Sequence, residues 1–242
     1  MAFIHGKDAA VIHGAYPLTS FLNDGSVSQD VETAETTAFG AAGGAKTYIT
    51  GLRDATLSAS GMFDGDASAV DVVLSGSIGS DTLAPVLFAQ SGIAAGNRCY
   101  ILQGKTTSYE VSAPVGDVVS VSYDAQADGG ADDAILLTAL AAVTATGNGS
   151  SQDNSASTSN GGIAQLHVTA NTMNNNMVFK VQHSADNSTW ADLATFTTVA
   201  TTVTTSERVT VASGTTVNRY LRANYTASGT GSVTFTMAFA RR

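Results

Sequence analysis

The stretch Val119–Gln126 reads VSVSYDAQ, in which apolar and polar residues alternate. The same alternation occurs over Ala55–Phe63, ATLSASGMF, and over Val233–Phe239, VTFTMAF. A period of two places residues such as Leu57 and Phe63 on one side of a strand, facing a core, and leaves the other side to water. The many Thr and Val residues favour strands, and Gly, Asn and Asp separate the runs. The sequence therefore predicts an all-β protein built as a sandwich or barrel.

The composition indicates a folded chain. Only 13% of the 242 residues are charged and 43% are hydrophobic, which is enough apolar surface to build a core. The net charge of −9 argues against a classical nucleic-acid grip, which needs a basic face. The N-terminus lacks the layout of a signal peptide. The most apolar stretch, Ile135–Val143, is far below the roughly 20 residues of a membrane helix. We therefore expect folding in a cytosol, without membrane insertion.

The composition changes near residue 146. Residues 146–162 are rich in Gly, Ser and Asn, which predicts a flexible linker between a β-domain at 1–145 and a second domain at 163–242. Residues 1–145 carry 16 acids and 5 bases, whereas residues 163–242 carry 3 acids and 6 bases. This asymmetry suggests that the two parts face different surroundings.

One segment has a helical pattern. Asp66–Leu74 begins with an acidic capping candidate and places Val70, Val73 and Leu74 on one face, with glycines shortly after it. A second segment, Asp132–Val143, fits a helix and a buried strand equally well.

Two stretches of the sequence are candidate ligand sites. Gly40–Thr47, GAAGGAKT, lacks one glycine of a phosphate-binding P-loop because Ala45 stands there, and neither a buried strand nor a helix flanks it. We therefore predict a flexible loop. Asp124–Asp133 gathers four carboxylates around two glycines, which leaves open a weak cation site or an exposed acidic turn.

The chain carries no catalytic motif in its required context, so we do not expect an enzyme. The four histidines are widely spaced, and no Gly-x-Ser-x-Gly nucleophile elbow is present. The single cysteine, Cys99, lies in a strand-like run, which predicts a buried thiol. The single tryptophan, Trp190, is either a core anchor or a sugar-stacking residue.

The N-terminal part resembles a bacteriophage protein family. Thr36–Gly40, TTAFG, and Ala45–Asp64, AKTYITGLRDATLSASGMFD, are similar to the major tail tube proteins of long-tailed, siphovirus-type phages. That family shows a threonine-rich segment ending in Phe-Gly, a loop, a Gly-Leu-x-Asp step and a strand closing on Gly-x-Phe-Asp. Ile12–Leu22 resembles the family's opening strand and turn. Phe179–Asp186 and Arg219–Ala223 resemble sandwich domains appended to phage structural proteins.

The resemblance implies a fold and a function. The fold is a tail-tube-type β-sandwich or barrel with one flanking helix, plus a second, smaller β-sandwich. The function is structural: hexameric rings stack into the tail tube through which the genome is delivered, and no cofactor is needed. The implied partners are other copies of the chain, other tail proteins and double-stranded DNA in transit. The implied location is the virion tail, assembled in the bacterial host cytoplasm. The alternatives are a carbohydrate-binding or adhesion module, and a capsid-decoration or tail-terminator protein.

Two sets of residues are candidate sites in such a tube. We expect the loop from Gly40 to Thr50 to contact a neighbouring ring, since its apolar residues need a partner. The candidate inter-ring contacts are Gly43, Gly44, Lys46, Tyr48 and Ile49. A conduit must not hold DNA through basic groups, so we expect acids on the inner wall. The candidate lumen-facing acids are Asp24, Asp30, Glu32, Glu35 and Asp124. The alternative is that these acids only solubilise the outer surface.

Overall fold

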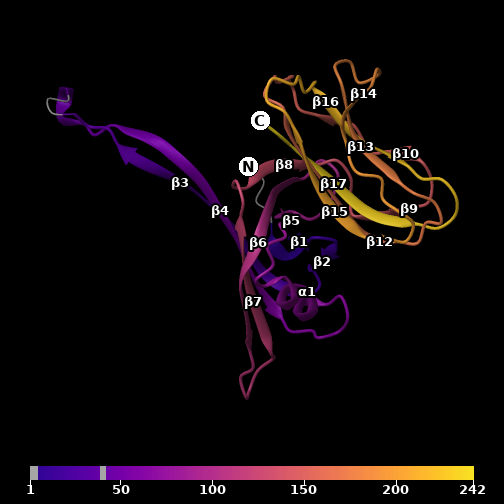
Figure 1. Ribbon diagram of the computed structural model, residues 1–242, viewed down its shortest axis with the longest axis horizontal. Coiled ribbons are helices and arrows are strands. Elements are labelled where there is room, and N and C mark those ends of the chain that lie inside the picture. Colours follow the sequence, from indigo (N-terminus) through magenta and orange to yellow (C-terminus); the bar gives the residue numbers. More distant parts are fainter. Residues whose placement is uncertain (1–4, 39–41) are drawn as a thin grey trace.

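The computed structural model describes residues 5–38 and 42–242, and antiparallel strands make up most of it (Figure 1). The strands are β1 (Ala10–His13), β2 (Tyr16–Pro17), β3 (Leu22–Glu35), β4 (Tyr48–Met62), β5 (Ala84–Ala89), β6 (Arg98–Ser112), β7 (Ser120–Ala127), β8 (Asp132–Leu136), β9 (Ala141–Val143), β10 (Gly147–Asn148), β11 (Gln152–Asp153), β12 (Gly162–Asn171), β13 (Val178–Ser184), β14 (Ala191–Thr195), β15 (Thr205–Val211), β16 (Tyr220–Thr226) and β17 (Val233–Arg241). The helices are α1 (Val70–Ser77) and the 3-10 turns η1 (Gly6–Asp8) and η2 (Ala42–Gly44). The expected all-β class with one flanking α-helix is confirmed.

The strands form two sheets. The larger sheet has the order β15-β12-β17-β8-β6-β5-β1-β2, and a branch from β6 adds β7, β4 and β3. The smaller sheet has the order β10-β16-β13-β14, with β11 also paired to β16. Figure 1 shows the β3–β4 hairpin leaving the body as a long arm, while the smaller sheet and its neighbours gather at the opposite side.

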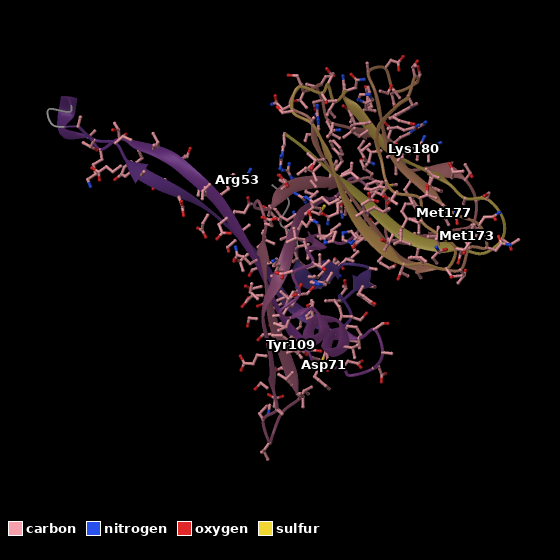
Figure 2. All side chains as sticks on the ribbon, viewed as in Figure 1. Arg53, Asp71, Tyr109, Met173, Met177 and Lys180 are labelled. Carbon is pink, nitrogen blue, oxygen red and sulfur yellow. The ribbon has the colours of Figure 1, made fainter. Side chains whose placement is uncertain are left out.

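Three apolar clusters hold the body together. The largest lies between the two sheets, where Phe179 and Phe235 have ring centroids 4.7 Å apart. Met173 and Met177, labelled in Figure 2, are buried in the same cluster. A second cluster lies between α1 and the strands β4, β7 and β6. The third cluster joins Ile12 and Leu136 to residues near both ends of the C-terminal part, such as Ile163.

The segment 146–162 is paired backbone rather than a free connection. Both of its short strands, β10 and β11, pair with β16. Its glycines serve close packing: a Cβ at Gly147 would lie 2.8 Å from the Tyr225 hydroxyl, and one at Gly149 would lie 2.7 Å from the Leu137 carbonyl. In addition, β17 pairs with β8 and β9, so the larger sheet crosses the expected boundary. The division into 1–145, 146–162 and 163–242 stays a prediction.

Two local expectations differ from the structure. Helix α1 begins at Val70 rather than Asp66; Ala69 occupies the N-cap without a side-chain hydrogen bond, and Gly76 lies inside the helix. Val70 and Leu74 are buried, as the pattern predicted. Phe63 is 40% exposed because β4 ends at Met62, before the alternation would bring that ring into the core.

The ambiguous segment Asp132–Val143 contains the strands β8 and β9. These strands pair with β6 and β17, so pairing with other strands decides between the helix and the strand that periodicity left open.

Candidate assembly surface

Four strands, in the order β3-β4-β7-β6, form a sheet whose outer two strands have free edges. Strand β3 pairs with β4 alone along its whole length. At the other side, β6 pairs with β5 only over Tyr100–Gly104, so its residues 105–112 pair with β7 alone. Within the described residues, this four-stranded sheet therefore presents unpaired backbone N–H and C=O groups along both sides. Such edges are templates for pairing with another chain.

One face of the four-stranded sheet is apolar and packs against α1. Leu57, Tyr123 and Ala125 are fully buried there beside Leu74 of the helix. The Tyr109 hydroxyl donates a 2.7 Å hydrogen bond to the Asp71 carboxylate, which ties β6 to α1 (Figure 2). Burial and this carboxylate raise the pKa of Tyr109, so the phenol stays a donor. This face is the body's own core and is closed to partners.

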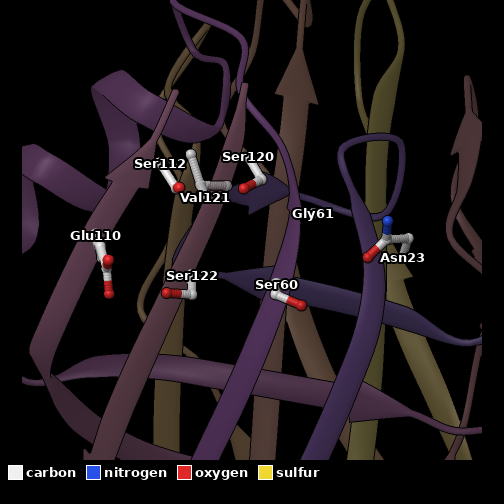
Figure 3. A pocket seen from close by; sticks show the side chains of 8 residues that line it. All are labelled: Asn23, Ser60, Gly61, Glu110, Ser112, Ser120, Val121 and Ser122. Atoms are coloured by element: carbon white, nitrogen blue, oxygen red, sulfur yellow. The ribbon is translucent and has the colours of Figure 1, made fainter. Parts of the chain in front are cut away.

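The opposite face, called here the polar face, carries hydroxyl groups and carboxylates. Directly opposed residues share a face, and the register defines two rows across all four strands. The first row is Asp24, Ser60, Ser122 and Glu110, and the second is Ser26, Ser58, Asp124 and Ser108. Figure 3 shows part of the first row, where a shallow pocket of about 330 Å³ is lined by serines, Asn23 and Glu110.

Basic residues near the polar face are paired or point elsewhere. Lys105 lies opposite Gln126, and its ammonium group makes a 2.8 Å ion pair with Asp81. Arg53 precedes Asp54 on β4, so it projects to the other side of the sheet, where its guanidinium donates to the Ala131 carbonyl at 3.2 Å. The polar face of the described sheet is therefore hydroxyl-rich and net acidic.

The register separates the five candidate lumen acids. Asp24, Asp30 and Asp124 share the polar face. Glu32 lies at a bulge beside Gly51, where a Cβ on the glycine would meet the Glu32 Cβ at 3.2 Å. Glu35 instead forms a 2.9 Å ion pair with Lys46, and this hydrogen bond lowers the pKa of the Glu35 carboxyl. Their orientation toward a lumen stays a prediction.

Sequence reasoning missed two acids on the same face. Asp54 lies directly opposite Asp30, and Glu110 opposite Ser122. The alternation of β4 contained the signal for Asp54, because it is in phase with Thr56 and Ser58. Like charges placed opposite each other destabilise a strand pair, but the Asp54 carboxylate accepts hydrogen bonds from the Ala55 N–H at 2.8 Å and from the Gln126 amide.

The arm is the outer half of the β3–β4 hairpin, and both of its faces are exposed. Four large apolar side chains on it, called here the arm patch, are Val31 (46% exposed), Tyr48 (55%), Ile49 (59%) and Leu52 (75%). Near the tip, Gly43 and Gly44 have φ angles of +78° and +67°, which only glycine adopts readily. The expected inter-ring contacts thus lie at the arm's end. Of the expected loop, Gly40 and Ala41 lie outside the described residues.

The P-loop-like stretch and the acidic turn lack the context of a ligand site in the described residues. The residues after the P-loop-like stretch form strand β4, not a helix. In the acidic turn, Asp133 pairs with Arg98, and Asp132 pairs with Arg208 and, at 3.3 Å, with Arg242. No group of three potential metal-ligating side chains exists in the described part of the chain. These residues therefore give no support for a cation site.

Buried polar groups join the N-terminal and C-terminal parts. The buried His167 imidazole donates from Nδ1 to the Gly14 carbonyl at 2.6 Å and accepts at Nε2 from the Gln165 amide at 2.8 Å. The same amide donates to the Val86 carbonyl at 2.9 Å. Burial lowers the pKa of His167 to about 4 and that of nearby His13 to about 4. These contacts fix one part against the other.

The single cysteine and the single tryptophan differ in how deeply they are buried. Cys99 is fully buried, as expected, and burial raises the pKa of its thiol to about 12. Trp190 is only half-buried, and the Arg222 guanidinium lies 4.2 Å from its ring centroid. Trp190 is therefore not a fully buried core anchor.

Among the described residues no helix is long and apolar enough to span a bilayer.

Comparisons with known proteins give weak likenesses. Neither a known protein family nor a curated protein matches the sequence. A chain of the virion of the native gene transfer agent particle is similar with a TM-score of 0.45 and 16% identity, covering 54% of this chain and 98% of its own length. A chain from the tail of the empty gene transfer agent particle, a structure with C6 symmetry, has a TM-score of 0.41 and 17% identity. The match covers 53% of this chain and 97% of that chain. The Dit protein of phage SPP1, described as a hub of the adsorption apparatus, has a TM-score of 0.37 and 14% identity. The match covers 96% of this chain and 98% of that chain. Likenesses this weak do not assign the chain to a family.

Proposed function

We propose that the chain is a structural tail protein of a phage or phage-like particle, and specifically the subunit of its tail tube. The single observation that carries the proposal is the four-stranded sheet with two free edges. When β3 of one copy pairs along β6 of the next, the sheets of a ring join into one continuous barrel, and the edge hazard is removed. A head-to-tail contact of this kind closes into a ring when its rotation permits.

The two faces of the sheet support one orientation in such a ring. The apolar face is covered by α1 and the body, so the polar face is the one that turns toward the axis. In Figure 1 the smaller sheet and α1 lie on the same side of the four strands. Residues 163–242 would then lie on the outside of the tube. The sequence resemblance to tail tube proteins supports the same arrangement.

A ring of six copies, as the resemblance implies, would have four strands from each copy. Barrels of 16–18 strands already leave an aqueous channel, so this larger barrel encloses an open bore. Its wall would carry Ser and Thr hydroxyls with carboxylates such as Asp24 and Asp124. DNA is bound tightly by Lys and Arg that neutralise its phosphates, and a wall without free basic groups lets the genome pass.

Negative-stain microscopy of the purified chain tests the proposal. Long tubes of uniform width are the expected result, assembled without other proteins or with a tail-tip fraction as nucleus. Particles that remain single rings would instead favour a tail terminator. Monomers under every condition would contradict the proposal and favour an adhesion or carbohydrate-binding module, and binding only to preformed shells would favour a capsid-decoration protein.

A further inference from the structure

The outer face of the smaller sheet carries polar and aromatic side chains that the proposed tube does not use. Phe179 and Val181 on β13 point into the core between the two sheets, so the alternation turns Gln182 outward. The register places Arg222 of β16 directly opposite Gln182. Trp190, the only tryptophan in the chain, directly precedes β14 and lies beside Arg222. In Figure 1, β13, β14 and β16 lie on the opposite side of the molecule from the arm.

A chain of contacts holds these side chains in one arrangement. Lys180 forms a 2.6 Å ion pair with Asp192, and the Gln182 amide donates to the other oxygen of that carboxylate at 2.8 Å. The Gln182 side-chain oxygen accepts from Nε and Nη2 of Arg222 at 3.0 and 2.8 Å. The guanidinium lies 4.2 Å from the centroid of the Trp190 ring, which is itself only half-buried. Exposed pairs of this kind contribute little to stability, whereas side chains that are already ordered lose less entropy when they bind a ligand.

The Arg222 guanidinium forms no ion pair among the described residues. Four other arginines each pair with an aspartate: Arg98, Arg208, Arg219 and Arg242. Arg222 instead donates to a neutral amide, and its Nη1 makes no hydrogen bond within the described part of the chain. Partial burial lowers the pKa of Arg222, so the cation is partly desolvated without an opposite charge to compensate it. The edge formed by Nη1 and Nη2 can therefore donate two parallel hydrogen bonds to a carboxylate.

The charges favour an acidic sugar over other anionic partners. Residues 163–242 carry 6 bases and 3 acids, in a chain whose net charge is −9. Nucleic acid and anionic membranes are held by clusters of unpaired basic groups, but Lys180 on this face is paired with Asp192. A sugar acid needs only one cation for its carboxylate, and the apolar side of its ring suits an aromatic side chain.

We propose that the outer face of the smaller sheet binds an acidic polysaccharide, with a uronate carboxylate held by Arg222 and the same sugar ring resting against Trp190. Gln182 keeps the guanidinium in place for this contact. The site lies outside the four-stranded sheet and leaves the edges of β3 and β6 open. It therefore goes beyond the proposed function and does not depend on it.

The single tryptophan makes the test direct. The intact chain is titrated with polygalacturonate while the fluorescence emission of Trp190 is followed, and neutral dextran of similar length is the control polymer. The expected result is a saturable change in emission with polygalacturonate and none with dextran. An equal change with both polymers would overturn the acidic specificity, and no change with either would overturn the site.

Variants separate a specific site from general attraction between charges. Arg222→Gln should weaken binding roughly tenfold or more, since it removes a charge-assisted hydrogen bond. Arg222→Lys keeps the charge beside Trp190 but loses the paired donors, so its affinity should lie between those of R222Q and the natural chain.

The matched control is Arg98→Gln, which removes an exposed arginine from the N-terminal part and should leave the affinity unchanged. Natural affinity in both R222Q and R222K, or an equal loss in R98Q, would overturn the inference. Tube formation is scored separately by microscopy, so neither result bears on the proposed function.

Discussion

Strands β17 and β4 share an alternating sequence but meet opposite environments. In β17, residues 235 to 240 are all buried, and even the Thr236 hydroxyl is enclosed, donating to the Thr138 carbonyl at 3.0 Å. In β4, the first seven residues are exposed, including Tyr48 and Ile49. A strand buried on both faces belongs to the subunit's own core. A strand with apolar residues exposed on both faces, carried on an arm, has no cover within the described residues, and we propose that another chain covers it.

Removing one large apolar side chain from each region should change the free energy of unfolding by very different amounts. Phe235→Ala should lower the free energy of unfolding by about 3–5 kcal/mol, because the ring packs against Phe179 and Tyr225 and leaves a cavity. Leu52→Ala in the arm should change it by less than about 0.5 kcal/mol, as expected of an exposed site. Urea denaturation of both variants measures the difference. Equal losses would show that the arm is part of the cooperative core.

Breaking the buried ion pair between Asp132 and Arg208, which joins the two parts of the chain, should also lower the free energy of unfolding. Removing one partner of a buried pair costs about 3–5 kcal/mol, because the remaining charge is uncompensated. Asp132→Ala should therefore destabilise the body, since the Arg208 side chain is only 9% exposed. Asp81→Ala, which breaks the exposed pair with Lys105, is the matched control and should have no measurable effect. If Asp132→Ala were as mild as the control, the junction would not be fixed by this pair.

Acid should weaken the body before it affects the arm. His13 and His167 have folded-state pKa values lowered from 6.5 to about 4 by burial, so the unfolded chain binds protons that the folded chain refuses. Stability is then lost as pH falls from about 6.5 toward 4, by roughly 1 kcal/mol for each histidine at pH 5.5. Unfolding curves at pH 7.5 and 5.5 measure this slope. A His167→Gln variant whose slope is unchanged would contradict the assignment.

The smallest effect on stability should accompany a large effect on assembly. The double variant Tyr48→Ser with Ile49→Ser should stay within about 0.5 kcal/mol of the natural chain, because both side chains are more than half exposed. Tube formation should fall, because the arm patch loses two of its four members. Val203→Ser, which changes an apolar side chain that is 46% exposed in the C-terminal part, away from the arm and from both sheet edges, is the matched surface control and should leave tube length unchanged. Tubes of normal length from the double variant would show that the arm patch is not a contact.

The comparison also explains what could be predicted from the sequence. Period-two alternation located the core faces of β4 and β7, because a strand's own residues report which side avoids water. In β17 it located only one of two buried faces. The sequence could not show that Thr236 is buried, since its cover includes Thr138, far away in the chain. It could not show that Asp30 faces Asp54, since the register of the β3–β4 hairpin is shifted by two bulges.

The glycine-rich segment shows the same limit. Gly147 and Gly149 suggested flexibility, whereas the structure needs them for close approach to Tyr225 and Leu137. Composition describes what the backbone can do, and only the neighbours decide which use is made of it. The free edges of β3 and β6 had no sequence signal, because an edge is defined by a missing neighbour.

The central claim is that β3 and β6 pair between copies, with the polar face turned inward. Electron cryo-microscopy of the assembled particle tests it most directly. The account predicts β3 of one copy hydrogen-bonded along residues 105–112 of β6 in the next, and Ser58, Ser60 and Asp124 on the inner wall. A particle in which these edges stay unpaired, or in which the polar face lies on the outer surface, would contradict it.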